Sequence, residues 1–404
     1  MRRLTRILMS FAYCYSQLLG VISFGYNIDT GYAIKKTYIT VYTVVINVVT
    51  VSMVPYLLMA MKIKPHPTGQ AALHQKLYIF MIMLRLAAVL LTVATNFLRR
   101  NDFIRNINDL QRFRENFTKK HCLRAKHDNF FSQHLYAKFF SSLFCEIMMF
   151  LTTLQILRVS FDVTNAWVLI TLSLLGTILN TLTCHYFFLA LHLHLLFNNI
   201  ADDLEEILIA TGKLFEMQHA QRICPGALMT QCCQLSDQVD DLARAHSKLL
   251  LLMDRLNGMF YIQGCCVLLL LYMNNVCMIY MTYMMGHHEQ LMPHMTEAMA
   301  WFLIPFMMGW YYTDAYLFTY LVLGLFDSAE RTYLLLQEHQ AWLPTLDERL
   351  EKSLQNFSLQ SLAFPCNRTL LHLFDLTRPL FFATLSSTMS NAIVLIQYDY
   401  KFRK

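Results

Sequence analysis

The sequence has few charged residues. They fill 15% of its 404 positions, whereas soluble domains carry about 25%. Apolar residues fill 56% of the chain, and the mean hydropathy is +0.37. This composition excludes a single water-soluble core. It predicts an all-α, polytopic membrane protein.

The sequence also lacks the motifs on which common enzyme classes depend. It has no Gly-rich phosphate loop, no Gly-x-Ser-x-Gly and no His-Glu-x-x-His. Its 11 cysteines show no metal-like spacing, so we predict no metal site, no cofactor and no disulfide framework. The net charge of +6 is modest and indicates no nucleic-acid partner. We therefore expect a membrane protein that is not an enzyme.

Seven apolar runs are long enough to cross a bilayer, which takes about 20 helical residues. These runs are 37–61, 77–98, 139–157, 166–190, 259–285, 299–326 and 379–398. A further run, Leu4–Phe24, is interrupted by polar residues. We interpret it as an interfacial or partly buried helix, with a spanning helix as the alternative.

The connections between the seven runs alternate in length. Those after the second, fourth and sixth runs are long, and the others are short. The first long connection, 99–138, is rich in Lys and Arg, whereas the last short one, 286–298, has neither. The positive-inside rule then predicts the N-terminus and the long connections inside, and the C-terminus outside.

Two of the long connections continue the apolar runs as amphipathic helices. Leu191–Leu214 extends the fourth run, and Gln234–Leu256 leads into the fifth. Because their apolar stripes need cover, we expect a packed helical layer inside the cell. Residues 329–357 are expected to add another helix, interrupted at Pro344.

Charges within membrane spans are costly, and they usually pair or face water. Arg85 can pair with Asp314 or with Glu146, either as the lining of a polar cavity or as a structural ion pair. Aromatic and amide groups of the fifth and sixth runs suit an organic-ligand pocket, although aromatic belts and core packing explain them equally well. The candidate pocket residues are Arg85, Glu146, Tyr272, Asn274, Trp310, Tyr311 and Asp314.

The last run, Pro379–Tyr398, is uncharged but not uniformly apolar. Helical steps back from Gln397 reach Val394, Ile393, Ser390, Ser386 and Ala383. Lipid offers such a small and polar stripe no partner, so the stripe is expected to face protein or water. Tight helix packing and the lining of a pore both meet that condition.

This run ends in a sequence that resembles the closing signature of insect gustatory receptors. The family has Thr-Tyr, five mostly apolar residues and then Gln-Phe, where this chain has Ser390–Tyr398. Leu373–Leu380 resembles the Gly-Leu-Phe-x-Leu-x-Arg lead-in. Asn391 departs from the family's Tyr, and Ala392 stands where sugar-sensing members tend to have Glu.

The resemblance implies a ligand-gated, non-selective cation channel of the plasma membrane, opened by a small-molecule tastant. Ala392 disfavours a sugar and leaves a bitter-type or other tastant. A homo- or heterotetramer with related receptors, embedded in membrane lipid, is implied around the seventh span. The implied pore and gate residues are Gln397, Tyr398, Val394, Ser390 and Ser386. The alternatives are a G-protein-coupled chemoreceptor, which requires the opposite orientation, and a membrane transporter.

Four regions are therefore expected. Residues 1–36 form a cytoplasmic or interfacial segment. Residues 37–326 hold the first six spans, the ligand pocket and the cytoplasmic helix extensions. Residues 327–378 form cytoplasmic anchor helices, and residues 379–404 form the pore helix with a short extracellular tail.

Overall fold

The computed structural model is helical over almost all of the residues it describes, which confirms the all-α fold. The described residues are 3–27, 30–62, 69–121, 125–157, 163–287, 297–340, 346–364, 369–370, 374–375 and 377–401. The helices are α1 (Arg3–Leu18), α2 (Thr37–Lys62), α3 (Gly69–Leu98), α4 (Arg100–Lys120), α5 (Ala125–Leu157), α6 (Val163–His219), α7 (Pro225–His287), α8 (Glu297–Gln340), α9 (Glu348–Ala363) and α10 (Arg378–Lys401). Two antiparallel strand pairs accompany them: β1 (Gly25–Tyr26) with β2 (Ala33–Ile34), and β3 (Thr369–Leu370) with β4 (Phe374–Asp375).

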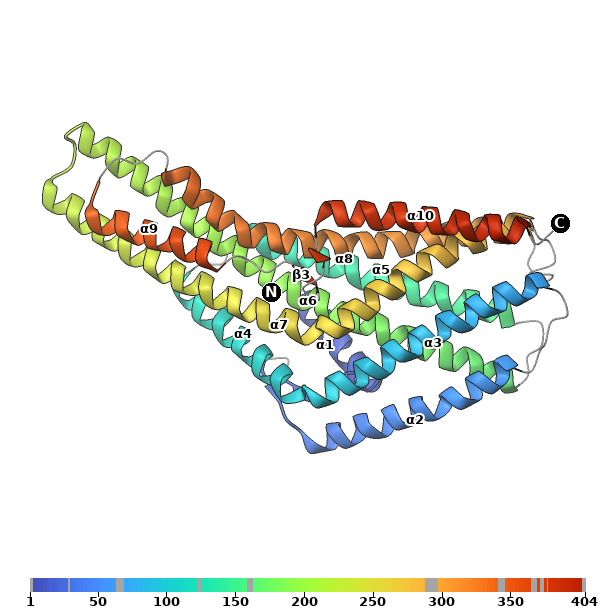
Figure 1. Cartoon of the computed structure of the whole chain (residues 1–404). Coiled ribbons are helices and arrows are strands. Elements are labelled where there is room, and N and C mark those ends of the chain that lie inside the picture. Colours follow the sequence, from blue (N-terminus) through green and yellow to red (C-terminus); the bar gives the residue numbers. More distant parts are fainter. Residues whose placement is uncertain are drawn as a thin grey trace.

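Six helices of the described residues are long and apolar enough to cross a membrane by length and composition: α2, α3, α5, α6, α7 and α10. The remaining predicted span, 299–326, lies in α8, which packs against α5 and α6 in the same bundle (Figure 1). Its polar residues, such as Tyr311 and Asp314, lower its hydropathy. The membrane part therefore has the seven long helices that the sequence predicts.

The N-terminal run folds as α1, a helix of 16 residues. At ~1.5 Å per residue it reaches about 24 Å, less than the ~30 Å of a bilayer core. Leu8, Met9 and Ala12 pack one side of α1 against the main hydrophobic core. These features fit the interpretation as a partly buried helix better than that of a spanning helix.

Helices α6 and α7 are continuous over 57 and 63 residues. Lengths of about 85 and 95 Å follow from ~1.5 Å per residue, roughly three times the thickness of a bilayer core. Both run past the ends of α2, α3 and α10 into a narrow arm (Figure 1). The predicted amphipathic extensions, 191–214 and 234–256, are thus confirmed as helices. We call α4, α9 and the projecting parts of α6, α7 and α8 the extramembrane layer.

The structure refines two helix boundaries in this layer: the start of α5 and the interruption between α8 and α9. The basic connection 99–138 is not an irregular loop: it holds α4 and the beginning of α5, which starts at Ala125 rather than near residue 139. Farther along, α8 ends at Gln340 and α9 begins at Glu348, on either side of Pro344, which lies outside the described residues. Asp347 caps α9, because its side chain accepts hydrogen bonds from the first backbone N–H groups of that helix.

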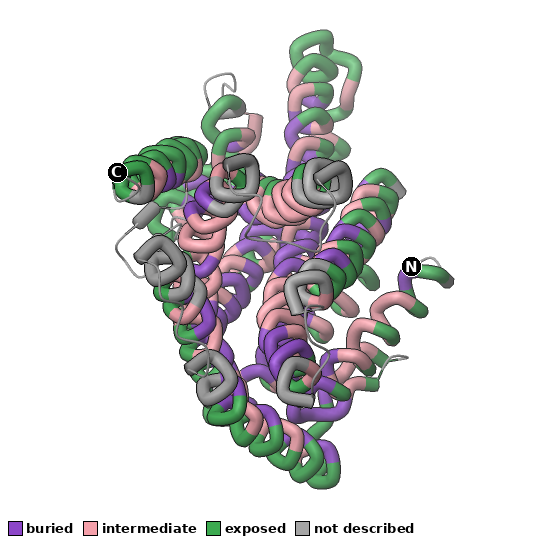
Figure 2. Tube along the Cα trace, turned by 90° about the vertical axis from the view of Figure 1, so that its right-hand side faces the viewer, coloured by how far each residue is buried: buried purple, intermediate pink, exposed green. Residues whose placement is uncertain are grey.

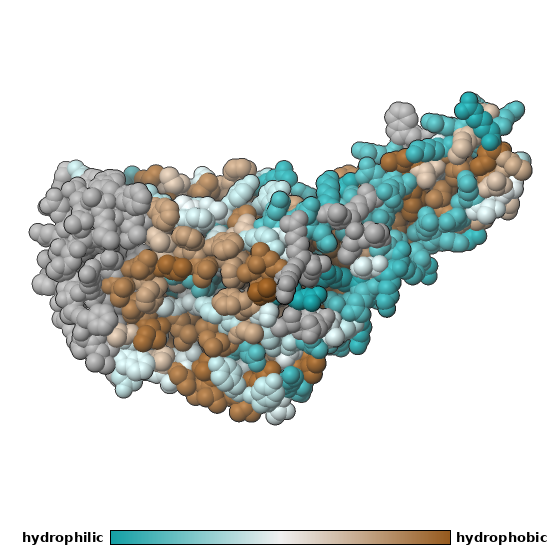
Figure 3. Space-filling model, turned by 180° about the vertical axis from the view of Figure 1, so that it is seen from behind, coloured by the Kyte–Doolittle hydropathy of each residue, from teal (hydrophilic) through white to brown (hydrophobic). Residues whose placement is uncertain are grey.

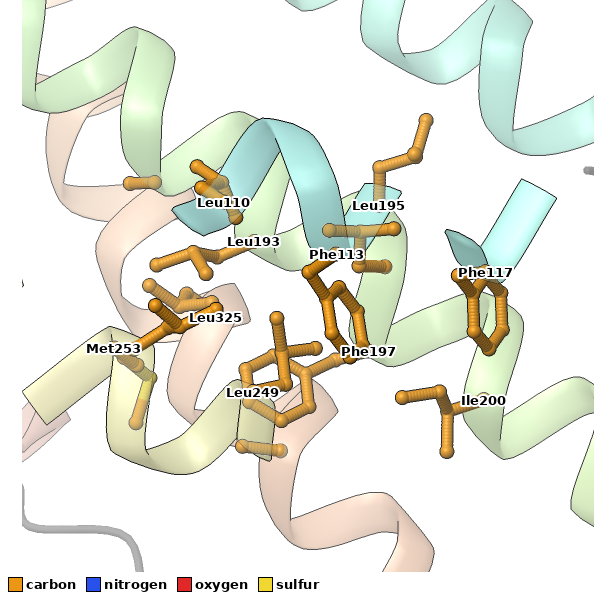
Figure 4. Close-up of a cluster of buried hydrophobic side chains, with 14 of the residues drawn as sticks. Leu110, Phe113, Phe117, Leu193, Leu195, Phe197, Ile200, Leu249, Met253 and Leu325 are labelled. Atoms are coloured by element: carbon orange, nitrogen blue, oxygen red, sulfur yellow. The ribbon is translucent and has the colours of Figure 1, made fainter. Parts of the chain in front are cut away.

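The largest hydrophobic core holds the extramembrane layer together. Phe113 of α4, Phe197 of α6, Leu249 of α7 and Leu325 of α8 meet in it (Figure 4). Figure 2 shows buried residues gathered along the middle of the bundle. Figure 3 shows apolar side chains spread over the broad membrane part, and hydrophilic side chains with a smaller apolar patch along the arm. The arm thus exposes fewer apolar groups than the membrane part does.

Candidate functional site

A cavity of about 290 Å³ lies between the helices of the membrane part. We call it the central cavity. Side chains of α3, α5, α6, α7 and α8 line it, and Phe381 of α10 completes the wall. Four of the predicted pocket residues are among the lining ones: Arg85, Asn274, Tyr311 and Asp314. Side chains that are far apart in the sequence thus meet around one cavity.

The acidic residue of this cavity is paired, but not with the partner expected from the sequence. Lys138 Nζ lies 2.6 Å from Asp314 Oδ2, and Ser141 Oγ donates to Asp314 Oδ1 at 2.5 Å. The side chain of Lys138 is only 1% exposed. This ion pair joins α5 to α8 at the edge of the cavity.

The expected pairing of Arg85 with Asp314 or Glu146 is wrong. Arg85 Nη2 instead donates to Asn274 Oδ1 at 3.3 Å. Glu146 accepts hydrogen bonds from Tyr15 Oη and Asn180 Nδ2, each at 2.8 Å. Glu146 thus joins α1 to α5 and α6, and it does not line the central cavity.

Two further candidates, Tyr272 and Trp310, also lie outside the cavity lining. The indole of Trp310 stacks on Phe144 with 4.7 Å between ring centroids. Tyr272 Oη lies 3.0 Å from Ser387 Oγ and accepts from Asn391 Nδ2 at 2.5 Å. Tyr272 is therefore a contact between α7 and α10.

Sequence reasoning missed several polar groups of the cavity, notably Lys138, Asn180 and Gln263. Gln263 Nε2 donates to Asn96 Oδ1 at 2.8 Å, while its own Oε1 is buried without a partner among the described residues. A buried carbonyl oxygen left unbonded costs free energy, so this atom favours a ligand or water that donates a hydrogen bond. Lys138 carried a signal, because it directly precedes the apolar run that begins at Phe139.

Helix α10 has two distinct faces. Thr388 and Ala392 are 1% and 0% exposed, on the side where α10 packs against α7. The opposite side carries the predicted pore and gate residues, and all of these are exposed in the single chain: Ser386, Ser390, Val394, Gln397 and Tyr398. Figure 2 shows the helix beside the C-terminus exposed along much of its length. The small and polar stripe thus points away from the rest of its own chain.

A second cavity, of about 160 Å³, lies beside the first. We call it the lateral cavity. It is enclosed by α1, the segment 21–26, α4 and α6. Leu182 and Phe260 line both cavities, and Phe260 makes edge-to-face contacts with Phe103 on one side and Tyr186 on the other. A thin aromatic wall therefore separates the two spaces.

Comparisons with known proteins bear on what this architecture is for. A family described as 7tm Chemosensory receptor matches residues 9–402. Putative gustatory receptor 36a of Drosophila melanogaster is 25% identical, over 98% of each chain. Putative gustatory receptor 59d of the same species is 23% identical, over 99% of each chain.

Solved structures share the fold. The insect olfactory receptor OR5 from Machilis hrabei superposes with a TM-score of 0.64 at 11% identity, over 97% of this chain and 98% of the receptor. The same receptor in complex with eugenol gives a TM-score of 0.65 at 10% identity, over 98% and 99% of the two chains. The arrangement of seven long helices with a projecting arm is therefore that of an insect chemoreceptor fold.

Proposed function

Because the chain belongs to the 7tm chemosensory receptor family, as a multi-pass protein of the plasma membrane, we propose that it is a ligand-gated cation channel opened by a small-molecule tastant. The family is one of receptors and not of enzymes. Gustatory relatives along the whole chain favour taste over smell. Ala392 favours a bitter-type or other non-sugar ligand. This buried position carries a methyl group, where sugar-sensing members tend to have the carboxylate of Glu.

The exposed stripe on α10 carries this proposal. Ser386, Ser390 and Gln397 turn polar groups away from their own chain, where lipid can satisfy none of them. Four copies arranged around an axis would give these groups water and each other as partners. The channel is then a tetramer, with Gln397 and Tyr398 forming the gate near one end of the pore.

The central cavity is the proposed tastant site. Its volume is close to the lower end of the ~300–1,000 Å³ range of small-molecule sites, and most of its lining is apolar. The free Oε1 of Gln263 selects a ligand that carries an O–H or N–H group. The eugenol complex of the olfactory receptor, a relative in fold, supports a small organic ligand of this size.

Gating follows from the contact between the cavity and the pore helix. Phe381 of α10 lines the cavity and packs in a small cluster with Val322 and Phe326 of α8. A ligand that fits the cavity better when α10 has moved outward would favour the open state. Only such a difference in affinity between the two states can open the channel.

Current recording in cells that express the chain tests the proposal, with G-protein signalling blocked and a panel of tastants applied. The substitution Gln397→Ala is expected to change basal or evoked current, because it removes the proposed amide ring at the gate. Gln231→Ala, an equal change at an exposed position of α7 in the arm, is the matched control. Normal surface expression with unchanged currents in Gln397→Ala would exclude the pore assignment. Currents that vanish when G proteins are blocked would favour the G-protein-coupled alternative.

The orientation is tested separately. With the N-terminus inside and the C-terminus outside, a tag fused after Lys404 is expected to bind antibody on intact cells. An N-terminal tag is the control, and it should be labelled only after permeabilisation. The reverse pattern would overturn the proposed topology.

A further inference from the structure

The lateral cavity contains a cation without a close partner. Arg114 of α4 lines the cavity. Among the described residues, none forms a hydrogen bond or an ion pair with its guanidinium. Burial lowers the pKa of Arg114, and the nearby charge of Asp128 acts in the opposite direction. The guanidinium is thus partly stripped of water and compensated only by charges at longer range.

The nearest acidic neighbour in sequence is already engaged. Glu115 Oε2 accepts from Tyr32 Oη at 2.9 Å, and Oε1 accepts from Gln111 Nε2 at 3.0 Å. Of the arginines that precede Arg114 on α4, Arg105 and Arg112 pair with acidic residues on the same helix, and Arg100 donates a hydrogen bond to Thr40 Oγ1. Arg114 therefore differs from all three, because no described residue forms a hydrogen bond or an ion pair with its guanidinium.

A second donor lies beside this cation. Tyr26 of β1 also lines the cavity. The charge of Arg114 acts to lower the pKa of the Tyr26 phenol, against the larger effect of burial, which raises it. Both groups therefore line one cavity within range of each other's charge. Among the described residues, none forms a hydrogen bond with the Tyr26 hydroxyl, so both donors are available to one acceptor.

The remainder of the cavity is apolar, with walls that include Ile107, Phe188 and Leu189. Its volume of about 160 Å³ holds roughly five groups of the size of water, at ~30 Å³ each. That is room for a small anionic head and the first carbons of a chain. A charge-assisted pair of donors at one end and apolar walls at the other match an amphiphile.

We propose that the lateral cavity binds an anionic amphiphile, whose carboxylate or phosphate head accepts hydrogen bonds from Arg114 and Tyr26 and whose alkyl chain lies along the apolar wall. A free fatty acid and an anionic membrane lipid share this chemistry. The site lies across the Phe260 wall from the central cavity and is distinct from the proposed tastant site.

Photolabelling tests the proposal without any current measurement. The full-length receptor in lipid nanodiscs is exposed to palmitic acid that carries a diazirine, and labelled peptides are identified by mass spectrometry. Label is expected on α4 or α6 residues that line the lateral cavity. Arg114→Gln should reduce it about tenfold, the usual cost of losing a charged hydrogen-bond donor. Arg112→Gln, a matched change at an exposed position, should leave it within twofold.

Competitors then identify the head and its source. Unlabelled oleate displacing the probe supports a fatty acid, and phosphatidic acid doing so supports a membrane lipid. Oleyl alcohol competing as well as oleate would overturn the role of Arg114, and displacement by inorganic phosphate alone would overturn the role of the chain. If Arg114→Gln does not fold by gel filtration, Ala12→Phe fills the cavity instead. Undiminished label in folded Ala12→Phe receptor would overturn the site.

Discussion

The extramembrane layer and the membrane part of the chain are built in opposite ways. In the layer, side chains such as Phe197, Ile200 and Leu249 are completely buried, and few of the charged side chains are. In the membrane part, α2 turns Val41 and Val48 outward, 58% and 62% exposed, and the buried positions include charged groups. Water drives apolar groups inward in the first region. Lipid removes that drive in the second, where polar contacts and close packing fix the helices instead.

The largest expected loss of stability comes from a substitution in the hydrophobic core of the extramembrane layer. Phe197→Ala should lower the free energy of unfolding by about 3 to 5 kcal/mol, because it removes a fully buried ring and leaves a cavity. Denaturant unfolding of the purified receptor in detergent measures this loss. Ile209→Ala is the control on the same helix, because Ile209 is 52% exposed, and it should change stability by no more than about 0.5 kcal/mol. Equal losses in both variants would contradict the description of the layer as a water-driven core.

In the membrane part, loss of the buried ion pair between Lys138 and Asp314 should lower the free energy of unfolding nearly as much. Lys138→Met leaves Asp314 without its cation, which should cost about 3 kcal/mol of unfolding free energy. Adding Asp314→Asn should recover most of the loss, since no unpaired charge then remains. Lys120→Met breaks an exposed pair with Asp241 in the layer and should cost at most about 1 kcal/mol. The comparison between the two regions fails if the two lysine variants lose the same stability.

The smallest expected free-energy change comes from a substitution at the contact between α10 and α7. Asn391 Nδ2 donates to Tyr272 Oη and to the carbonyl of Ser387. Removing the contact with Asn391→Ala should shift the balance between closed and open channels about fivefold, or ~1 kcal/mol. The ratio of basal to evoked current reports this shift. Tyr272→Phe should act similarly, and the double variant should add little. Fully additive effects would show that the two residues act separately.

Local patterns in the sequence predicted the helices well, because periodicity is a property of neighbouring residues. The extensions of α6 and α7 are the clearest case. Helix α4 carried the same signal, with Phe103, Leu110 and Phe117 on one face, but its many basic residues were interpreted only as a topology signal. Asn391, which departs from the family pattern, donates a hydrogen bond to Tyr272, and no spacing in the sequence could indicate this contact.

Pairings across the bundle could not be predicted in the same way. Lys138 and Asp314 are 176 positions apart, and Arg85 was an equally suitable partner for the acid by charge alone. Which cation meets which anion depends on how the helices are rotated and crossed in the bundle. That geometry depends on the packing of many side chains along the helices, not on the charged residues alone. The four predicted pocket residues that do line the central cavity could be named without knowing the pairings, because they are charged, aromatic or amide residues within apolar runs.

The aromatic wall at Phe260 belongs to both the central and the lateral cavity, so the two proposed ligands would share one wall. A molecule that turns this ring from one side changes the shape of the space on the other side. Thermodynamic reciprocity then requires that each occupant alter the affinity of the other by the same factor. If both proposed ligands bind, the threshold concentration for a tastant is expected to vary with the lipid composition of the cell, without any change in the receptor's own sequence.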